Sequence, residues 1–437
     1  MSAPAGLEFD AVIVGSGVTG TVMAALLLAG HLSVAGRVAV VADRLGAEPP
    51  PDADWDLRVF ALSRASERVL EACGVWDLLP PQRLFPYERM CVWDAAGAPD
   101  GKGSISFDSA QLGEPNLGFI VDGRTLQWKC LAAARAAGAV FMEAGIEALA
   151  AEAGGIAVRL SDGRTLRTRL LIGADGQESK TRELLGIDTA GHSYHQDALV
   201  AHVRTSKPHR STAWQRFLPG GPLAFLPLPD GRSSIVWTAG LLEAKRLRSL
   251  DGQAFGEALT DAGGGVLGRC ELASAVASFP LKLKVALDYV RPRAVLLGDA
   301  AHVVHPLAGQ GLNLGLLDCA VLTEVLGQGG GARGGAASAA ATFGEHRLLR
   351  RYERRRRGEN QLAAAAFDGL ERLFSSEHPA SAVLRMAGLR AVGMVPFVKR
   401  RLAEQALGLA DAPEFLKTDR GQRKPIEVKA GRPWPHK

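Results

Sequence analysis

The chain has 437 residues, of which 47% are hydrophobic and 22% are charged, and its formal net charge is +5 at pH 7. This composition is typical of a globular protein, and the length predicts two or three domains with ample core. The five cysteines form no CxxC pair and have no histidine cluster near them. Their scatter favours a reducing compartment and argues against structural zinc, so we expect no metal site.

The N-terminal segment Met1–Asp10 carries neither a basic stretch nor a cleavage site, which predicts that the protein is not exported. The most apolar window, Ala11–Gly30, approaches membrane-spanning length but contains four glycines. We interpret it as a buried strand followed by a helix rather than as a spanning helix. The expected location is therefore the cytoplasm.

The first motif is a glycine-rich turn between an apolar strand that begins at Asp10 and a helix over Thr21–Ala29. In this strand–turn–helix context, GxGxxG predicts a dinucleotide site. Gly15 permits the tight turn, Gly17 lets the backbone approach a pyrophosphate, and Gly20 permits close packing of the helix on the strand.

A second strand over Arg37–Ala42 ends at Asp43, which is placed to bond an adenosine ribose hydroxyl. Farther along, Ser63 is predicted to be a helix N-cap, and Glu67 lies near the positive end of that helix dipole. Arg58 precedes the cap and is either a phosphate clamp or a surface arginine.

Two later strands also end in a turn that carries a carboxylate. The strand Thr165–Ile172 leads to Asp175-Gly176, and the strand Ala294–Leu297 leads to Gly298-Asp299. Each turn alone is common. Together with the glycine motif, the two turns predict three pieces of one nucleotide site.

The segment after Asp299 predicts the start of a helix that faces an anion. A residue before proline is pushed away from helical angles, so His305-Pro306 is expected to be extended. Gly309-Gln310-Gly311 is then predicted to be a bend with outward-facing N–H groups, followed by a helix over Leu312–Leu326. His302 and His305 lie in this segment, but a histidine in such a turn is more often a structural donor. We therefore assign no catalytic base.

Between Ala198 and Leu281 the sequence changes to alternating or apolar runs separated by proline and glycine turns. This pattern predicts a meander of antiparallel strands, with a helix over Gly252–Asp261. We expect an inserted sheet that covers the nucleotide and forms a substrate cavity, with substrate contacts from Trp214–Leu228.

The C-terminal part is predicted to be helical. Gly327–Ala340 is of low complexity and is expected to be a flexible loop, and helices are expected over Thr342–Phe374, Ser381–Leu389 and Pro396–Leu409. The basic run Arg347–Arg357 is either the solvated face of a helix or a docking site for an acidic membrane surface or partner. Nucleic acid is disfavoured because only one tyrosine is interleaved there.

Taken together, these residues resemble the class A flavoprotein aromatic monooxygenases and, within them, the ubiquinone-biosynthesis hydroxylase family. The resemblance spans nearly the whole chain. It is carried by GxGxxG at Gly15–Gly20, Asp56-Leu-Arg58 with Ala61-Leu-Ser63, Val92-Trp-Asp94, Ala174-Asp-Gly176, and the run from Gly298 to Gly315, which is the most specific.

The resemblance implies an α/β fold like that of para-hydroxybenzoate hydroxylase: a Rossmann-like FAD-binding domain, an inserted antiparallel β-sheet substrate domain, and C-terminal helices. The implied FAD-binding parts are residues 1–80, 119–195 and 285–340. Substrate-domain strands are implied over 81–118, the substrate-binding sheet domain over 196–284, and a helical region with a tail over 341–437.

The resemblance also implies a set of FAD contacts: Gly15, Gly17, Val18, Gly20, Asp43, Arg58, Arg124, Gln127, Asp175, Gly176, Gly298, Asp299, Pro306, Gly309, Gln310, Gly311, Leu312 and Asn313. Within this set, Asp43 would bind the adenosine ribose and Asp299 the ribityl hydroxyls. The stretch 309–313 would lie under the isoalloxazine, and Pro306 would line the space between flavin and substrate.

The implied activity is hydroxylation of the ring of a polyprenylated phenol in ubiquinone biosynthesis, with NAD(P)H and O₂, through a C4a-hydroperoxyflavin. There is no second glycine fingerprint, so NAD(P)H is expected to bind transiently, or a partner delivers the electrons. The implied partners are a peripheral membrane surface or a ubiquinone biosynthetic complex. Two alternatives stay open: a hydroxylase of a soluble aromatic or polyketide substrate, and a non-catalytic flavoprotein scaffold.

Overall fold

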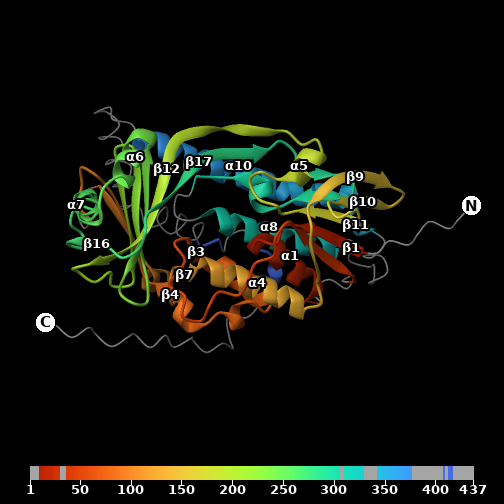
Figure 1. The fold of residues 1–437 in the computed structure, drawn as a ribbon, viewed down its shortest axis with the longest axis horizontal. Helices are drawn as coiled ribbons and strands as arrows, with labels where there is room; N and C mark the ends of the chain where they lie inside the picture. The colour runs from red at the N-terminus through yellow and green to blue at the C-terminus, as the bar shows by residue number, and fades with distance from the viewer. Residues whose placement is uncertain are drawn as a thin grey trace, which may run out of the picture.

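The computed structural model of the chain describes residues 9–29, 36–99, 101, 103–305, 310–328, 342–375, 407–408 and 412–416. Two large sheets lie at opposite ends of the molecule, and helices and two long strands run between them (Figure 1). The expected helices over Ser381–Leu389 and Pro396–Leu409 fall outside the described residues, apart from a turn at Leu407-Gly408. Most of the expected loop over Gly327–Ala340 falls outside them too.

Within the described residues, eight strands form the first sheet, in the order β18-β19-β11-β1-β2-β8, with β10 pairing β11 and β9. These strands are β1 (Phe9–Val14), β2 (Val38–Ala42), β8 (Val140–Glu143), β9 (Ile146–Glu152), β10 (Gly155–Leu160), β11 (Thr165–Gly173), β18 (Val290–Arg291) and β19 (Ala294–Leu296). The run from β19 to β8 is parallel. This arrangement is the Rossmann-like half that the sequence predicted.

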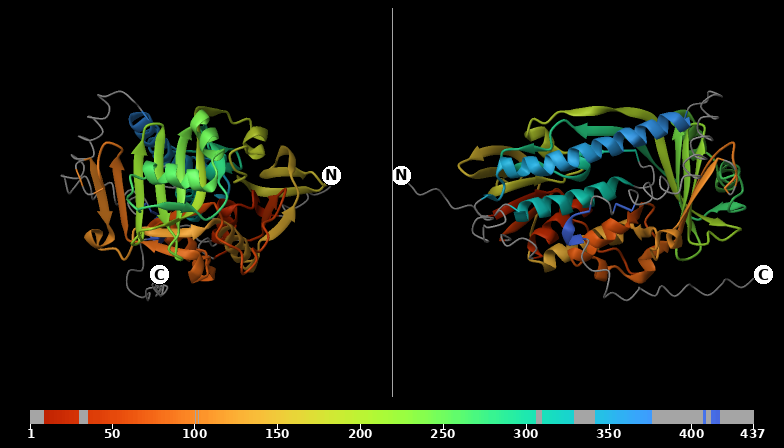
Figure 2. Two further views of the ribbon diagram at one scale, coloured as in Figure 1. Left: turned by 60° about the vertical axis from the view of Figure 1, so that its left-hand side comes forward. Right: turned by 180° about the vertical axis from the view of Figure 1, so that it is seen from behind.

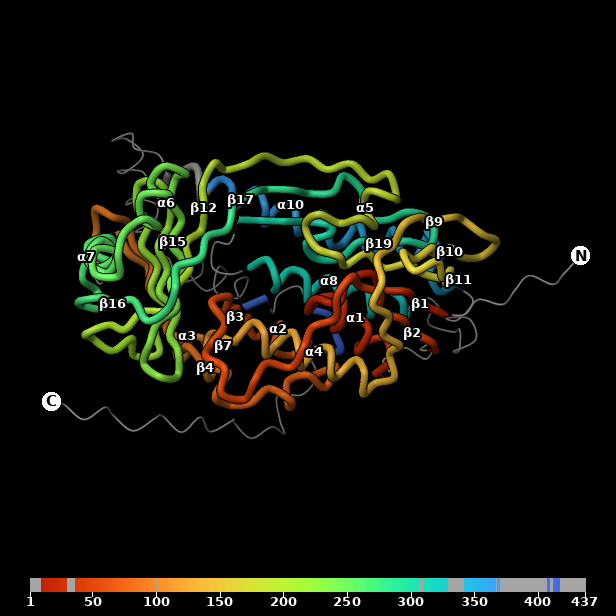
Figure 3. The backbone as a smooth tube through the Cα atoms, viewed as in Figure 1, coloured from red at the N-terminus to blue at the C-terminus, as the bar shows by residue number. Residues whose placement is uncertain are grey.

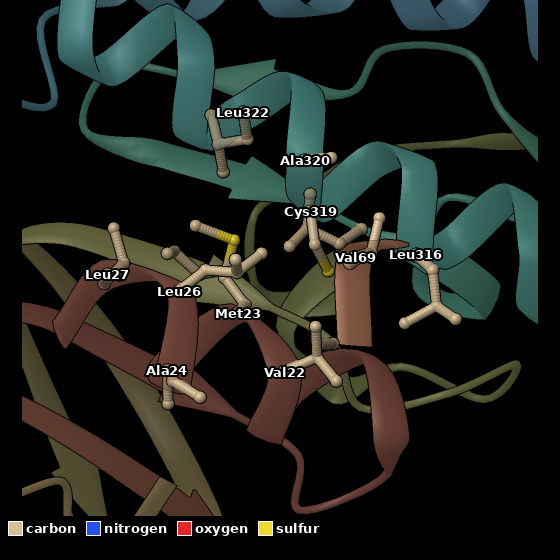
Figure 4. Close-up of a cluster of buried hydrophobic side chains, with 14 of the residues drawn as sticks. Val22, Met23, Ala24, Leu26, Leu27, Val69, Leu316, Cys319, Ala320 and Leu322 are labelled. Carbon is tan, nitrogen blue, oxygen red and sulfur yellow. The ribbon is translucent and has the colours of Figure 1, made fainter. Parts of the chain in front are cut away.

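Four helices pack beside this sheet: α1 (Val18–Leu28), α4 (Gly123–Ala136), α8 (Gln310–Gly327) and α10 (His346–Ser375). Figure 4 shows Val22, Met23 and Leu26 of α1 directed toward Leu316 and Cys319 of α8. These side chains are almost fully buried, and each contributes about 1.5–3 kcal/mol to the stability of the packing. Of the helices that the structure describes, none is long and apolar enough to cross a membrane.

A second sheet contains nine of the described strands, in the order β20-β17-β12-β15-β14-β13-β5-β6, with β16 beside β12. Its strands are β5 (Arg89–Asp94), β6 (Ser104–Asp108), β12 (Thr189–Thr205), β13 (Thr212–Leu218), β14 (Gly221–Pro227), β15 (Ser233–Gly240), β16 (Cys270–Leu272), β17 (Ala277–Ala286) and β20 (His302–Val303). The predicted antiparallel meander is confirmed in β12 to β15. The parallel pairing of β13 with β5 was not predicted.

Alternate side chains of this second sheet face opposite directions. One face packs against α6 (Leu241–Arg248) and α7 (Gly252–Ala262) and forms a separate core around Phe225 and Phe255. The helix α7 agrees with the predicted helix. The helix α6 was not predicted, because apolar residues recur only weakly at helical spacing within its eight residues. The other face of the sheet is turned toward the rest of the molecule.

Two long strands join the ends of the molecule. The strands β12 and β17 run side by side along the molecule, as Figure 3 shows, and their pairing is irregular between Ser193 and Asp197. His195 in this irregular stretch has a left-handed φ of 54°. The helix α10 runs beside them and reaches from β18 to β13 and β14 (Figure 2).

A small third sheet lies between the large ones, and three of the described strands form it: β3 (Val59–Ser63), β7 (Gly118–Asp122) and β4 (Leu84–Tyr87). The helix α2 (Arg64–Ala72) follows β3, and the Ser63 hydroxyl accepts a hydrogen bond from the Ser66 N–H, which confirms the predicted N-cap. The remaining short elements are η1 (Trp76–Leu78), η2 (Pro81–Arg83), α3 (Ser109–Leu112), α5 (Lys180–Leu184), η3 (Gly298–Ala300) and η6 (Glu414–Leu416).

Three predicted helix starts are wrong. The helix α1 begins at Val18 rather than Thr21, so part of the glycine motif already lies inside the helix. The helix α8 begins at Gln310, so Gln310 and Gly311 belong to its first turn and do not form a bend before it. Glycine accepts helical angles as readily as turn angles, and the sequence pattern could not separate the two. The helix α10 begins at His346 rather than Thr342, because Gly344 has a φ of +77° and an added Cβ there would lie 2.6 Å from the Arg169 carbonyl oxygen.

Candidate functional site

The site is built at one edge of the parallel strands. The glycine turn follows Val14, which is the register neighbour of Val41 on β2 and of Gly173 on β11. Gly173 in turn neighbours Leu296 on β19. The turns after β1, β2, β11 and β19 therefore leave the sheet at the same edge, where ligands bind in open parallel sheets. The structure thus brings together the glycine turn and the turns that carry Asp43, Asp175 and Asp299.

The glycine turn leaves room for a ligand at one of its three glycines. A Cβ at Gly15, where φ is +112°, would lie 2.2 Å from the Ala174 carbonyl oxygen, and a Cβ at Gly20 would lie 2.1 Å from the Gly15 oxygen. Around Gly17, by contrast, no described heavy atom lies within 4 Å of an added Cβ. Two glycines therefore serve close packing, and the third borders open space.

The N-terminus of α1 is suited to bind an anion. Gly17 is its N-cap, and among the described residues no side chain caps the helix and no acidic residue stands in its first turn. The first N–H groups and the positive end of the dipole, beginning at Val18, are therefore left for a ligand. The residues present fit the pyrophosphate of a dinucleotide.

The neighbouring carboxylates differ in how they are used. Asp43 is exposed beyond the end of β2, which suits contact with a ribose. Asp175 instead accepts hydrogen bonds from the Ser179 hydroxyl at 2.5 Å and from the Thr181 N–H and hydroxyl at 2.8 and 2.9 Å. Its carboxylate holds the turn before α5, and the adjacent Gly176 lines the cavity described below. Contact of Asp175 with FAD stays a prediction.

Asp299 lies between the nucleotide edge and the cavity. Burial raises the pKa of its carboxyl, and the neighbouring His302 and Arg58 oppose that rise. Arg58 itself is exposed, and its guanidinium lies 5.0 Å from the centre of the Phe60 ring. A carboxylate and an arginine at the end of an otherwise apolar cavity can orient a polar ligand group.

A buried network fixes the Gly298-Asp299 turn, and the sequence did not reveal it. Asp318 of α8 accepts hydrogen bonds from the Gly298 N–H at 3.0 Å, His302 Nε2 at 2.6 Å, Arg356 Nε at 2.7 Å and Asn360 Nδ2 at 3.2 Å. Burial alone would raise the pKa of Asp318, but His302 and Arg356 outweigh it and hold the pKa well below its usual range. The only sequence signal was a carboxylate inside an apolar helical run.

Asn313 secures the start of α8 against the small sheet. Its Nδ2 donates to the Ala61 carbonyl at 2.9 Å, and its Oδ1 accepts from the Ser63 N–H at 3.0 Å and from the Ser66 hydroxyl at 2.6 Å. These bonds occupy the described polar atoms of the side chain. A contact of Asn313 with FAD stays a prediction.

The cavity has a volume of about 720 Å³ and lies between the nucleotide edge and the inner face of the nine-stranded sheet. Its polar lining comes mostly from the nucleotide side and includes Arg58, Gln177, Asp299, His305 and Gln310. The sheet contributes mostly apolar side chains: Met90, Phe107, Ala198, Val200, Ala213, Trp214, Pro222, Ala224, Leu226, Val236, Phe279 and Leu281. Such an enclosure suits a ligand with a polar end and an apolar body.

Some of the other predicted FAD contacts line the cavity and some do not. Gly311 and Leu312 line the cavity beside Gln310. Arg124 is exposed, and its guanidinium donates to the Asp54 carbonyl at 3.1 Å. Gln127 is half-buried beside Gly46, and neither Arg124 nor Gln127 is among the described cavity residues. Pro306 and Gly309 lie outside the described residues.

Known proteins resemble this chain over most of its length. The family profile described as "FAD binding domain" matches residues 124–360. The chain is 36% identical to the ubiquinone hydroxylase UbiL of Rhodospirillum rubrum, over 94% of this chain and 92% of that protein. It is 33% identical to the 3-demethoxyubiquinol 3-hydroxylase of Escherichia coli, over 91% of this chain and 98% of that protein.

A solved structure supports the fold alone. The p-nitrophenol 4-monooxygenase PnpA of Pseudomonas putida DLL-E4 superposes with a TM-score of 0.70 at 17% identity, over 91% of this chain and 98% of that one. The α/β arrangement with a second sheet facing the nucleotide edge is therefore that of the FAD-dependent monooxygenases.

Proposed function

The chain belongs to the ubiquinone-biosynthesis family of FAD-dependent hydroxylases, and on that premise we propose that it hydroxylates the aromatic ring of a polyprenylated phenol. One observation carries the proposal for this particular chain. The cavity of about 720 Å³ joins a polar end at the nucleotide edge to an apolar wall from the nine-stranded sheet. A phenol with a prenyl chain has the same division into a polar ring substituent and an apolar tail.

The apolar wall supports the choice of a lipid substrate. In the segment proposed for substrate contact, Trp214–Leu228, every second residue of β14 from Pro222 to Leu226 lines the cavity. On β13 the adjacent residues Trp214 and Gln215 both line it. Burial of a hydrocarbon tail against such a wall contributes about 0.8 kcal/mol per CH₂ group. A prenyl chain therefore adds affinity that a small soluble phenol would lack.

The cofactor proposed for the nucleotide edge is FAD, with its pyrophosphate at Gly17 and Val18 and its adenosine ribose at Asp43. Asp299 would bind the ribityl hydroxyls, and the N-terminus of α8 at Gln310 would favour negative charge on the ring system. Bound FAD supplies the redox chemistry that brings O₂ to the substrate ring. The chain's own residues bind and orient the two molecules and keep water out of the cavity.

We propose NAD(P)H as the reductant. Because the sequence holds a single glycine fingerprint, at Gly15–Gly20, the nicotinamide has no binding fold of its own. It therefore binds briefly or is replaced by an electron-delivering partner. The measurement is the rate of flavin reduction in anaerobic mixing with NADH and with NADPH. If neither NADH nor NADPH reduces the flavin, electron delivery by a partner protein is favoured.

We also propose that part of the basic run contacts a membrane surface peripherally, on the cytoplasmic side. Four of its arginines are engaged in ion pairs within the described residues: Arg350, Arg355, Arg356 and Arg357. The exposed arginines Arg347, Arg351 and Arg354 lie three or four positions apart, which places them on one face of α10. The candidate membrane contact is therefore this face of three arginines rather than the whole run Arg347–Arg357.

The membrane proposal predicts that flotation with anionic liposomes depends on the exposed face. Reversing Arg347, Arg351 and Arg354 to glutamate should abolish flotation and leave the unfolding temperature within a few degrees of wild type. Undiminished flotation of this triple variant would contradict the proposal.

The function itself is tested by combining two measurements. The purified protein should show the absorption spectrum of a bound flavin, and cells without its gene should accumulate a prenylphenol that lacks one hydroxyl. A bound flavin together with normal quinone levels would contradict the proposed prenylphenol substrate and favour a soluble aromatic substrate. Absence of bound flavin after reconstitution would contradict the assignment of FAD as the cofactor.

A further inference from the structure

Within the described residues, two side chains that line the cavity, those of His305 and Trp214, have a buried polar atom without a hydrogen-bond partner. The indole of Trp214 can only donate, so His305 is the one of the two that can accept a hydrogen bond. The side chain is 1% exposed and lines the cavity directly after β20. Among the described residues, neither Nδ1 nor Nε2 has a hydrogen-bond partner. A buried polar group without a partner costs about 1–3 kcal/mol. A ligand group that supplies the missing bond would remove this cost.

The two histidines of this segment have different roles. His302 Nε2 is bonded to Asp318 at 2.6 Å, inside the buried network that holds the Gly298 turn. His305, three residues later, faces the cavity and packs edge-on against the Tyr194 ring, with 5.0 Å between the ring centres. The prediction that such a histidine is a structural donor is confirmed for His302. For His305 the structure offers no such bond among the described residues.

The surroundings of His305 keep its ring neutral. Burial lowers the pKa of His305 to about 4, and the carboxylate of Asp368 on α10 opposes this only in part. Asp368 is also the partner of His192, at 3.3 Å between Oδ1 and Nε2, and His192 packs edge-on against Tyr194. At neutral pH the imidazole therefore has one nitrogen with a free lone pair, which can accept a hydrogen bond from a hydroxyl.

We propose that His305 recognises the ring hydroxyl of the substrate by accepting its hydrogen bond, and so fixes the orientation of the ring in the cavity. The proposal rests on the proposed function and names the side chain that distinguishes a free phenol from an ether. Three charged side chains line the cavity among the described residues: Arg58 and Asp299 at its polar end, and Lys282 on β17, whose Nζ is paired with Glu178 Oε1 at 3.7 Å. A neutral acceptor in a mostly apolar cavity suits a neutral phenol without the cost of burying a charge.

The test compares a phenol with its methyl ether, because the ether keeps the ring and the prenyl chain but has no hydroxyl proton. Binding of both short-chain compounds to the FAD-loaded enzyme is measured by calorimetry, without turnover. Wild type should prefer the phenol by about fivefold to tenfold, the value of one hydrogen bond. His305→Leu should reduce this preference to less than about twofold, as expected when the acceptor is removed.

Two further variants separate recognition from structure. His305→Gln keeps an acceptor oxygen and should retain most of the preference for the phenol. Thr238→Val removes the hydroxyl of another buried residue that lines the cavity and should leave the preference unchanged. Flavin content and unfolding temperature, measured for each variant, identify any that fails to fold.

The outcomes distinguish this inference from the proposed function. If wild type prefers the phenol and His305→Leu retains that preference, the assignment of His305 is wrong while the function stands. If Thr238→Val loses the preference instead, the recognition site lies on β15. Wild type that binds neither compound would overturn the proposed function and this inference together.

Discussion

At the turn after β1, an added Cβ would collide with backbone at Gly15 and Gly20 but would meet open space at Gly17. The sequence predicted these three roles because GxGxxG is a local pattern whose geometry depends on adjacent residues. It could not predict that the Asp175 carboxylate accepts hydrogen bonds from Ser179 and Thr181 at the start of α5, since an Ala-Asp-Gly turn gives no sign of which donors will surround it. Local motifs fix the backbone path better than they fix the partners of a side chain.

Gly17→Ala should separate folding from cofactor binding. Gly17 has a φ of −68°, which alanine adopts without strain, so the unfolding temperature of the apoprotein should stay within about 2 °C of wild type. The added methyl would occupy the space proposed for the pyrophosphate, and FAD affinity should fall at least about tenfold, or 1.4 kcal/mol. Fluorescence titration of the apoprotein with FAD measures this.

A matched control exists in the second sheet. Gly240 is the N-cap of α6, with a φ of −58° and no described heavy atom within 4 Å of an added Cβ. Gly240→Ala should change neither stability nor FAD affinity. Equal FAD affinity in Gly17→Ala and Gly240→Ala would contradict the location of the pyrophosphate.

Glu67 provides a pH-dependent prediction. Burial raises the pKa of its carboxyl to about 7, against the opposing charge of Arg64. A raised carboxyl pKa gives stability that is fully present below the unfolded pKa, near 4.5, and is lost as the pH rises through 7. The free energy of unfolding of wild type, relative to Glu67→Gln, should therefore fall by about 2 kcal/mol from pH 5 to pH 8. Urea unfolding at both pH values measures it, and a relative stability that rises with pH would show the opposite sign.

At the scale of elements, α8 and α10 are joined by a buried ion pair rather than by apolar packing alone. Arg356 donates to Asp318 and is also paired with Glu359. The sequence predicted both helices from their periodicity, but it showed Arg356 only as part of a basic run. Periodicity marks which face of a helix is apolar. It does not show that one arginine turns inward to meet a carboxylate 38 positions earlier in the chain.

Arg356→Met should destabilise the protein by about 3–5 kcal/mol, because it leaves the buried Asp318 carboxylate without its arginine partner. Arg354→Met on the same helix removes an exposed arginine and should change the stability by less than about 0.5 kcal/mol. Denaturant unfolding of both variants gives the comparison. Similar stability of the two variants would mean that the buried pair does not hold α10 in place.

At the scale of the whole molecule, the cavity exists because one sheet ends at the nucleotide edge and the inner face of the other sheet is turned toward it. The antiparallel meander was predictable from alternation between adjacent turns. The parallel pairing of β13 with β5 joins Trp214 to Cys91 across more than a hundred residues, and no local pattern encodes such a pairing. The resemblance implied that strands over 81–118 belong to the substrate domain, but the parallel register that places β5 beside β13 was not predicted.

Filling the cavity should block the substrate without releasing the flavin. Ala224 lines the cavity on β14, so Ala224→Phe should retain wild-type FAD affinity and reduce substrate-stimulated NAD(P)H oxidation at least about tenfold. Ser106→Phe places the same ring on an exposed position of β6 in the same sheet and should leave the activity unchanged. Full activity of the Ala224→Phe variant would show that the substrate does not bind in this cavity.

The fate of oxygen during turnover tests the proposed ring hydroxylation most directly. The FAD-loaded protein is incubated with a short-chain prenylphenol, NAD(P)H and isotopically labelled O₂, and the products are analysed by mass spectrometry. One labelled oxygen is expected on the aromatic ring of the product. Reductant consumption that yields only labelled peroxide, with the phenol unchanged in every prenylphenol tried, would contradict the proposed hydroxylation.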